Sequence, residues 1–422
     1  MAKKAEKPKP ELTKRQLTRR QQQQRRHYII LSAGILIVVA VLSVVGSGVY
    51  TQWYVPEYKP LRQTVIEVNE TKFDMDYYLK MLKYYGAGAS SQQLMALTDM
   101  VATAIEQSEL ARQEAMKLGI SVSDEEVEKE RKSSDSPLSS DYNDVVRTQL
   151  LVSKLLDEYF DKQVPTSAEQ RHVMAMFLES LSQASGVRAR LGAGEDFSKL
   201  AGELSLDAIS KTNNGDLGWR PKGVLTSLLE TSVVDDYAFT GEVGKLSQPL
   251  PDETKTKTLG YWLVKVLSRD DAAKTAQVKV MLLGSEQEAN EVRTRLESGE
   301  DFATLAKELS QHDASKENGG DFTVSSQDTM GSAFKDFVFK SELNMLSQPI
   351  RDDTMSTKKG YWLVKVAEVD SNRQIDKDDR NLLKSDALNK WFTGVTNNPE
   401  NKVKSYLDDE QKIWAITHVV RG

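Results

Sequence analysis

Hydrophobic and polar residues follow several distinct patterns along the chain, and the longest is an apolar run near the amino terminus. Ile29 to Val49 contains no charged residue. At a rise of about 1.5 Å per residue, a helix over this run would be about 31 Å long, which matches the hydrocarbon thickness of a bilayer. The apolar part of a cleaved signal peptide is the alternative, but such parts usually hold about 7 to 15 residues. The pattern predicts one transmembrane helix within residues 28–54.

The next region, residues 61–163, has a mainly helical pattern. VIEVNETKF, residues 65–73, alternates apolar and polar positions and is typical of a strand and a turn. The helical periodicity that follows ends at Gly119, since glycine readily adopts the left-handed conformation of a helix cap. A last helix is expected near Asp144 to Phe160. We expect a small helical domain over residues 61–163.

Two repeats follow this region. The heptapeptide GYWLVKV occurs at residues 260–266 and again at 360–366. Earlier in each repeat, G-E-D-F occurs at residues 194–197 and 299–302. These matches predict two copies of one domain, over residues 168–270 and 275–370.

Each repeat is expected to contain a first strand, two amphipathic helices, a glycine turn, a short helix and the GYWLVKV strand, which closes its own repeat. Side chains alternate across a strand, so Trp262, Val264 and Val266 share one face. Strands and helices mixed in so small a domain indicate an α+β fold, with an antiparallel sheet packed against helices. The remaining residues, 374–422, predict helical stretches at Leu382 to Trp391 and Val403 to Trp414.

Composition limits the possible chemistry. The chain has 422 residues, of which 39% are hydrophobic and 28% charged, and it contains no cysteine. Disulfides, iron–sulfur clusters and thiol catalysis are therefore excluded. The four histidines lack metal-ligand spacing and no phosphate-binding loop is present, so we expect no metal and no cofactor.

Charge is distributed unevenly. Residues 1–27 carry ten lysines or arginines against two glutamates, whereas the whole chain has a net charge of −6. A basic arm can bind nucleic acid, but this one directly precedes the apolar run, where the positive-inside rule applies. We therefore expect a cytoplasmic basic arm over residues 1–27, a single pass through a bacterial cell membrane, domains outside the cytoplasm, and no nucleic-acid partner.

The repeats resemble the parvulin type of peptidyl-prolyl isomerase. The motifs that carry the resemblance are L-x-x-G-x-D-F-x-x-L-A-x-x-x-S, G-D-L-G-W, F-x-x-G-E-V-G-x-x-S-Q-P and G-Y-x-L-V-K-V. The preceding helical segment is similar to the N-terminal chaperone domain of SurA-like and PrsA-like foldases. The resemblance implies two parvulin-like domains and, as partners, unfolded or proline-containing polypeptides.

The resemblance also implies site residues. The proline-pocket positions of the family fall on Phe322, Met330 and Phe334 in the second repeat and on Leu217, Leu225 and Val234 in the first. Simple core packing is the alternative for these apolar residues. The family's acidic position falls on Asp207 in the first repeat and on His312 or Asp313 in the second. Asp207 and Asp313 are therefore the catalytic candidates, with a solvated turn or helix-cap aspartate as the alternative.

Two histidines that are usual in active parvulins are missing from both repeats. The first-strand position falls on Ala175 and Val280, and the last-strand position on Trp262 and Trp362. His172 lies three residues too early and is expected to be a surface or satisfied histidine. Trp262 and Trp362 would line the substrate groove with apolar volume but remove a hydrogen-bonding ring. Such a domain can keep its peptide groove while losing catalytic rate.

Two functions follow from these observations. One is a membrane-anchored foldase, a peptidyl-prolyl cis-trans isomerase that assists the folding of secreted proteins. The other is a non-catalytic holdase that binds unfolded polypeptides through degenerate parvulin domains. A purely structural assembly factor is a third alternative.

Overall fold

The computed structural model describes residues 43–45, 48–50, 54–55, 58–133, 138–270 and 272–421. These residues form two compact units: one holds the residues up to Leu155 together with those from Trp391 onward, and the other holds Leu156–Lys390. The predicted basic arm and most of the predicted membrane helix lie outside the described residues. Within those ranges, no helix is both long enough and apolar enough to cross a membrane.

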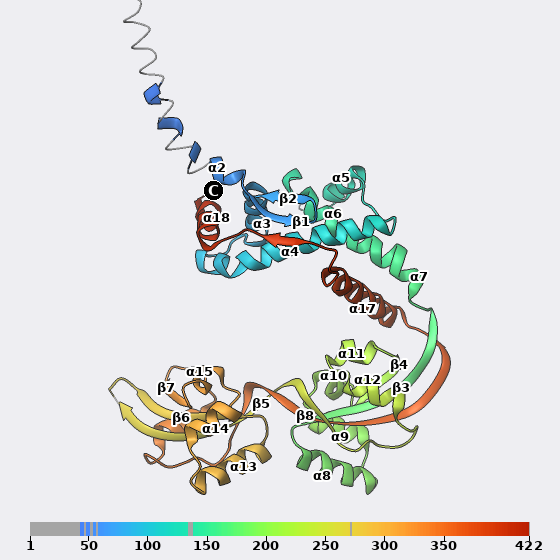
Figure 1. Ribbon diagram of the computed structural model, residues 1–422. Coiled ribbons are helices and arrows are strands. Elements are labelled where there is room, and N and C mark those ends of the chain that lie inside the picture. The colour runs from blue at the N-terminus through green and yellow to red at the C-terminus, as the bar shows by residue number, and fades with distance from the viewer. Residues whose placement is uncertain are drawn as a thin grey trace, which may run out of the picture. The chain divides into compact units, whose positions relative to one another are not determined.

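The first unit contains a small sheet covered by helices (Figure 1). Its strands are ordered β2-β1-β9. The strands and main helices are β1 Thr64–Val68, β2 Thr71–Asp74, α3 Met75–Tyr85, α4 Ser91–Lys117, α5 Asp124–Ser133, α6 Asn143–Lys154, β9 Val403–Ser405 and α18 Asp409–Arg421. Helix α4 begins at a capping box in which Ser90 and Gln93 satisfy each other's backbone amides.

The carboxyl-terminal residues differ in part from the prediction. α17, Lys377–Thr396, covers the first predicted helical stretch, but the second begins as a strand. Val403–Ser405 pairs antiparallel with β1, and the helix starts only at Asp409. The prediction of a helix from Val403 was wrong because pairing with a strand more than 300 residues earlier, not local periodicity, decides the conformation of these three residues.

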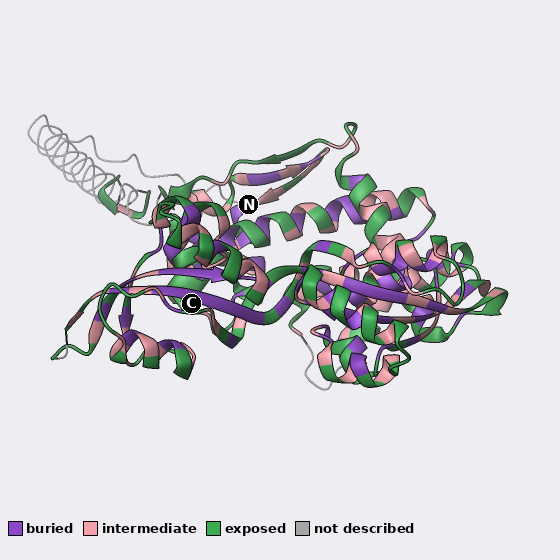
Figure 2. Cartoon of the chain, turned by 90° about the horizontal axis from the view of Figure 1, so that it is seen from below, coloured by how far each residue is buried: buried purple, intermediate pink, exposed green. Residues whose placement is uncertain are grey.

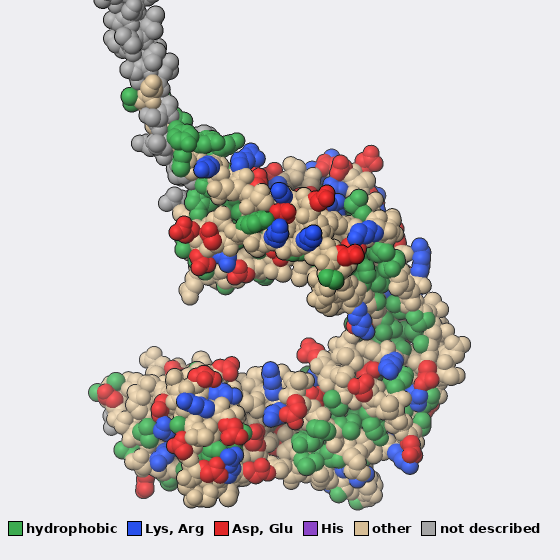
Figure 3. Space-filling view, viewed as in Figure 1, with side chains coloured by type: hydrophobic (Ala, Val, Ile, Leu, Met, Phe, Trp, Pro, Cys, Tyr) green, Lys and Arg blue, Asp and Glu red, His purple; other side chains and the backbone are tan. Residues whose placement is uncertain are grey.

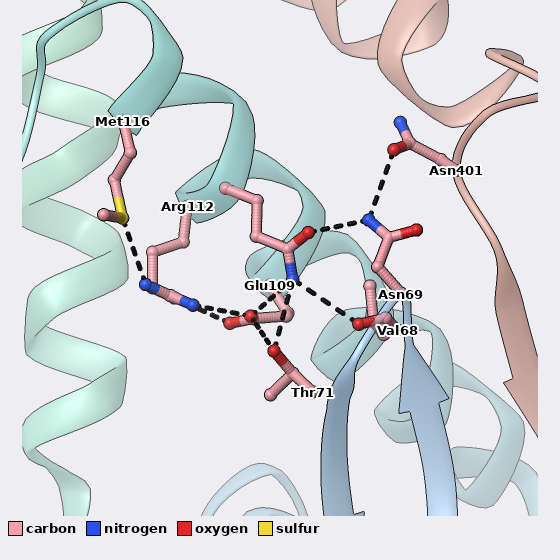
Figure 4. Close-up of polar contacts among 8 residues, drawn as sticks. Val68, Asn69, Thr71, Glu109, Arg112, Met116 and Asn401 are labelled. Atoms are coloured by element: carbon pink, nitrogen blue, oxygen red, sulfur yellow. Dashed lines mark hydrogen bonds and ion pairs between the residues drawn. The ribbon is translucent and has the colours of Figure 1, made fainter.

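A polar network around the buried Glu109 joins parts of this unit (Figure 4). Glu109 on α4 is 6% exposed and accepts hydrogen bonds from Thr71, Arg112 and Gln113. Gln113 in turn accepts one from Asn69, whose side chain also accepts the backbone N–H of Lys402. The network therefore fastens the β1–β2 turn and the chain before β9 to helix α4.

The second unit is built on a six-stranded antiparallel sheet with the order β4-β3-β8-β5-β6-β7. The first repeat supplies β3 Ser167–Leu178, α8 Leu181–Gly192, α9 Phe197–Leu204, α10 Ala208–Thr212, β4 Asp216–Pro221, α11 Val224–Leu229, α12 Val233–Thr240 and β5 Leu250–Asp270. The second supplies β6 Thr275–Leu283, α13 Glu286–Glu297, α14 Phe302–Leu309, α15 Asp313–Lys316, β7 Asp321–Ser325, α16 Ser332–Lys340 and β8 Ile350–Gln374.

The repeated motifs set the helix starts and turns. Asp196 and Asp301 of the two G-E-D-F motifs cap α9 and α14 by accepting a backbone N–H three residues on. Gly320 follows α15 with a φ of 85°, and a Cβ there would lie 2.8 Å from the carbonyl oxygen of Val280. Only glycine fits this turn, which explains the Gly-Asp pair in both repeats.

The last strands are exchanged between the repeats. In β5 the residues from Tyr261 onward pair with β6 of the second repeat, whereas in β8 the residues from Tyr361 onward pair with β3 of the first. The two long strands cross where Thr256–Thr258 pair with Ser356–Lys358. The expectation that each GYWLVKV strand closes its own repeat was therefore wrong: each completes the other repeat.

The exchange produces two composite domains, which share β5 and β8 (Figure 1). The first composite domain joins residues 167–252 with 361–374, and the second joins 275–352 with 260–270. In each composite domain, helices pack on both faces of the sheet. In the first domain, α11 and α12 cover one face and α8 and α9 the other. In the second domain, α16 covers one face and α13 and α14 the other. The shared strands are among the most deeply buried parts of this unit (Figure 2).

Candidate functional site

An aromatic cluster lies on the second composite domain, at the positions predicted for the proline pocket. Phe322 comes from β7, Met330 from the loop before α16, and Phe334 from α16. All three belong to one apolar cluster with Trp262, which β5 brings from the first repeat. Phe334 and Trp262 are fully buried, whereas Phe322 and Met330 are half-buried. The cluster thus presents a partly exposed apolar surface on a buried base.

His312 completes this cluster. Its ring lies edge-on to Trp262 at 5.0 Å between centroids and to Phe322 at 5.1 Å. Nδ1 of His312 lies 2.8 Å from Oγ of the buried Ser315. Burial lowers the pKa of His312, and the neighbouring Asp313 opposes this shift only in part. His312 is therefore a neutral imidazole at pH 7, with a hydrogen-bonding nitrogen beside the apolar surface.

Of the two positions left open by the sequence, His312 points into the cluster and Asp313 does not. Asp313 is exposed, at the first residue of α15. Its predicted catalytic role stays untested, but His312 is the residue with the contacts of a site group. His312 is the N-cap residue of α15, whereas Asp313 is the first residue of that helix. The sequence alone does not fix where this short helix begins, so it could not decide between the two residues.

Two aspartates that the sequence analysis did not select hold the tryptophans. Nε1 of Trp262 donates to Oδ2 of Asp352 at 3.2 Å, and Nε1 of Trp362 donates to Oδ2 of Asp252 at 3.0 Å. The signal was present, because Asp-x-Thr follows S-Q-P at the same offset in both repeats. These carboxylates satisfy the indole N–H groups inside the core, where an unpaired donor would be costly.

The first composite domain has a different arrangement at the equivalent place. Asp207 stands where His312 stands in the second repeat; it is 5% exposed and caps α10 through Ser210. Its Oδ2 lies 2.9 Å from Nζ of Lys255, which sits 6.0 Å from the ring of Trp362. An ion pair between a buried aspartate and a half-buried lysine thus lies near the tryptophan, so the predicted catalytic Asp207 is engaged in a structural contact.

The apolar residues predicted for the first repeat are core residues. Leu217 is 3% exposed, and Leu225 and Val234 are fully buried together with Trp362. This placement favours the core-packing alternative for these residues, and only the second repeat brings predicted groove residues to the surface. Nε2 of His172 lies 2.8 Å from Oδ1 of Asp216, and the ring stacks on Trp219, whereas its buried Nδ1 has no hydrogen-bond partner among the described residues.

Both repeats match models of a known protein family. A family model described as a PPIC-type PPIASE domain matches residues 176–268, and a second model with the same description matches residues 261–370. Each repeat is thus similar to a PPIC-type domain. Each match is continuous in sequence, whereas each composite domain takes its last strand from the other PPIC-type repeat.

Individual relatives extend the likeness. The chain is 34% identical over 166 residues to the foldase protein PrsA of Caldanaerobacter subterraneus, covering 36% of this chain and 51% of that protein. It is 24% identical over 310 residues to the chaperone SurA of Chromohalobacter salexigens, covering 70% and 62%. The alignments span roughly half of these curated relatives. The crystal structure of PrsA from Bacillus cereus aligns with 14% identity and a TM-score of 0.28, covering 85% of this chain and 99% of that one.

Proposed function

We propose that this chain is a membrane-anchored foldase of the extracytoplasmic space, a peptidyl-prolyl cis-trans isomerase whose site lies in the second composite domain. The observation that carries the proposal is the half-buried Phe322 and Met330 surface over Trp262, with the neutral His312 at its side. The PrsA-like and SurA-like relatives support a role in protein folding. The substrates would be unfolded chains with an exposed X-Pro bond.

The chemistry requires no nucleophile and no cofactor. Rotation about an X-Pro bond is slow because amide resonance imposes a barrier of about 18–20 kcal/mol. A surface that grips the proline ring and binds the twisted amide more tightly than the planar forms lowers this barrier, and each 1.36 kcal/mol, approximately, gives a tenfold rate. Phe322 and Met330 would contact the ring, and the thioether of Met330 adapts to different neighbours. The imidazole of His312 would hydrogen-bond the rotating amide.

A prolyl-peptide assay tests this assignment. Phe322→Ala and Met330→Ala should each lower kcat/KM for cis-to-trans relaxation about tenfold or more, because each removes about 1.4 kcal/mol or more of transition-state contact. Thr323→Ala is the matched control: Thr323 is the exposed neighbour of Phe322 on β7 and hydrogen-bonds Gln277. Circular dichroism checks that each variant is folded. Full activity in both folded groove variants would place the site elsewhere.

The second candidate function is that of a holdase without turnover. The Asp207–Lys255 ion pair favours it, because it fills the first domain's equivalent site, and both family histidine positions of the last strand carry tryptophan. A holdase would suppress aggregation of an unfolded client without accelerating X-Pro relaxation. Measuring both activities on the same preparation separates the two functions.

The membrane anchor rests on the sequence alone. The uncharged Ile29–Val49 run and the preceding basic arm support one pass with a cytoplasmic amino terminus. The mixed Lys, Arg, Asp and Glu side chains on the described surface fit soluble domains in either compartment (Figure 3). Protease treatment of intact spheroplasts tests the orientation: residues beyond about 55 should be digested from outside. Protection of these residues until the membrane is broken would reverse the assignment.

A further inference from the structure

The exchanged strands, residues 260–270 and 361–374, make the same contacts in the repeat that receives them. The backbone N–H of Val264 donates to Ser347, and that of Val364 donates to Ser247, both at 2.9 Å. The tryptophan–aspartate hydrogen bonds repeat in the same way. Because the two heptapeptides are identical, these contacts would be the same whichever of the two heptapeptides a repeat received.

The connecting segments, residues 253–259 and 353–359, are what distinguish the two possible arrangements. In this structure they run straight on and pair with each other, Lys257 with Thr357 at the centre. If each strand folded back on its own repeat, the same polar residues would form a hairpin loop. Loops of about this length are common, so the two connecting segments themselves allow either arrangement.

A lysine side chain is buried at the crossing. Lys257 is 2% exposed, and its Nζ donates to the carbonyl oxygens of Lys358, at 3.0 Å, and Lys359. Burial lowers its pKa to about 8, Glu179 and Glu288 oppose the shift, and Lys359 adds to it. The segments that surround it contribute backbone at Gly284 and the amide side chain of Gln311, which bonds Lys358. No carboxylate forms an ion pair with Lys257 among the described residues.

We propose that the two repeats hold their last strands in either of two arrangements, exchanged as in this structure or each folded back on its own repeat, and that Lys257 at the crossing sets the balance between them. The exchanged arrangement must enclose this side chain, whereas a hairpin loop leaves it in water. A second consequence concerns the site: the tryptophan beneath Phe322 is Trp262 in the exchanged arrangement and Trp362 in the other.

The direction of the pH dependence follows from this difference. An exposed Lys257 has the ordinary pKa of 10.5, and the buried one has a pKa of about 8. Charged lysine therefore favours the folded-back arrangement, and raising the pH from 7 to 9 favours the exchanged one by about tenfold. Below pH 7 both forms are protonated and the balance no longer changes.

Cysteine pairs can report the arrangement directly, because the chain contains no cysteine of its own. Met174 pairs with Lys365 in this structure, and Lys365 corresponds to Lys265 in the other repeat. In the triple variant M174C/K265C/K365C, the thiol at position 174 joins position 365 in the exchanged arrangement and position 265 in the folded-back one. Directly paired strand residues are close enough for a disulfide. Because both products form in one molecule, oxidation chemistry affects them equally.

The variant is equilibrated in a glutathione buffer at pH 7, 8 and 9, and the two disulfides are counted by peptide mass spectrometry. We expect both disulfides, with the 174–365 to 174–265 ratio rising about tenfold between pH 7 and pH 9. Adding Lys257→Met should raise the ratio at pH 7 and make it independent of pH. Adding Lys358→Met, which removes an exposed neighbouring charge, should preserve the pH dependence.

Three results would overturn the proposal. Complete absence of the 174–265 disulfide at every pH would mean that the exchange is permanent. A pH dependence that survives Lys257→Met would mean that another group sets the balance. Disulfide-linked dimers as the main product would mean that a second copy of the chain supplies the strand.

Discussion

Trp262 donates its indole N–H to Asp352 across the boundary between the two repeats, and Trp362 does the same to Asp252. Each hydrogen bond joins the last strand of one repeat to the body of the other. Each carboxylate is also held by the threonine two residues later, Thr354 or Thr254. Each composite domain therefore has the same hydrogen bond between its received strand and its body. The candidate site lies next to the one formed by Trp262 and Asp352.

Removing the acceptor of Trp262 should destabilise the second composite domain. Asp352 is 4% exposed, so Asp352→Ala leaves a buried indole donor and costs about 1–3 kcal/mol of unfolding free energy. Urea denaturation followed by tryptophan fluorescence measures this. Asp353→Ala is the matched control, since Asp353 is exposed and forms an ion pair with the exposed Arg351. Equal stability of the two variants would contradict the structural role of the hydrogen bond.

The same carboxylate gives a dependence on pH. Burial alone would raise the pKa of Asp352, but hydrogen bonds from Thr354 and Trp262 outweigh it and hold the pKa below 3.8. A carboxyl with a lowered pKa stabilises the fold above its ordinary pKa, and this contribution is lost as the pH falls through the lowered value. The stability difference between the protein and its Asp352→Asn variant should therefore be constant above about pH 5 and shrink below pH 4. A difference that grows in acid would have the wrong sign.

His312 gives the isomerase assay its own pH test. Burial lowers the pKa of His312, so the neutral ring persists below pH 6.5. If the neutral imidazole assists rotation, kcat/KM should stay level from pH 8 down past 6.5 and fall only in more acidic buffer. His312→Gln should lower the plateau about tenfold or more and remove the acid limb. His172→Gln serves as control, because His172 bonds Asp216 away from the cluster. An acid limb that remains in His312→Gln would assign it to another group.

Substitutions of Asp207 and Lys255 in the first composite domain should have non-additive effects on the free energy of unfolding. Asp207 is buried and Lys255 is half-buried, so Asp207→Ala leaves the ammonium with only the carbonyl oxygen of Leu229 among the described residues and should cost up to about 3–5 kcal/mol. Lys255→Met places there the residue type of the equivalent Met355. The double variant Asp207→Ala/Lys255→Met should recover more than about 1 kcal/mol relative to the sum of the single changes. Additive losses in a denaturation cycle would show that the two groups act independently.

Much of the second unit could be predicted, because residues close together in sequence determine its helix caps and turns. The pairing of strands that are far apart in sequence could not be predicted. The helix caps at Asp196 and Asp301 and the turn at Gly320 are set by neighbours in sequence, so the repeated motifs predicted an α+β domain twice. The exchange could not be predicted, because identical heptapeptides carry no signal for which repeat each one joins. The same limit explains the strand at Val403–Ser405, whose partner is β1. It also explains the choice between His312 and Asp313, which depends on how α15 meets the sheet.

The last prediction concerns the helical unit, where Glu109 on α4 accepts a hydrogen bond from Thr71 of the β1–β2 hairpin and anchors Gln113, which in turn binds Asn69 (Figure 4). Burial alone would raise the pKa of Glu109, but hydrogen bonds from Arg112, Gln113 and Thr71 hold it below its ordinary value. Glu109→Ala removes the acceptor that these three donors share and should cost about 1–3 kcal/mol.

The direction in which the stability loss changes with pH distinguishes the loss of the ionised carboxylate from the loss of side-chain volume. Because the folded pKa of Glu109 is lowered, its charge stabilises the unit at neutral pH, and that contribution fades as the pH falls below about 4.5. The gap in melting temperature between the protein and Glu109→Gln should therefore narrow in acid. Glu114→Ala, which removes a partner of the exposed Lys117 on the same helix, should change the stability by less than about 1 kcal/mol. A gap for Glu109→Gln that is the same at pH 7 and pH 3 would show that the ionised carboxylate contributes nothing to the fold.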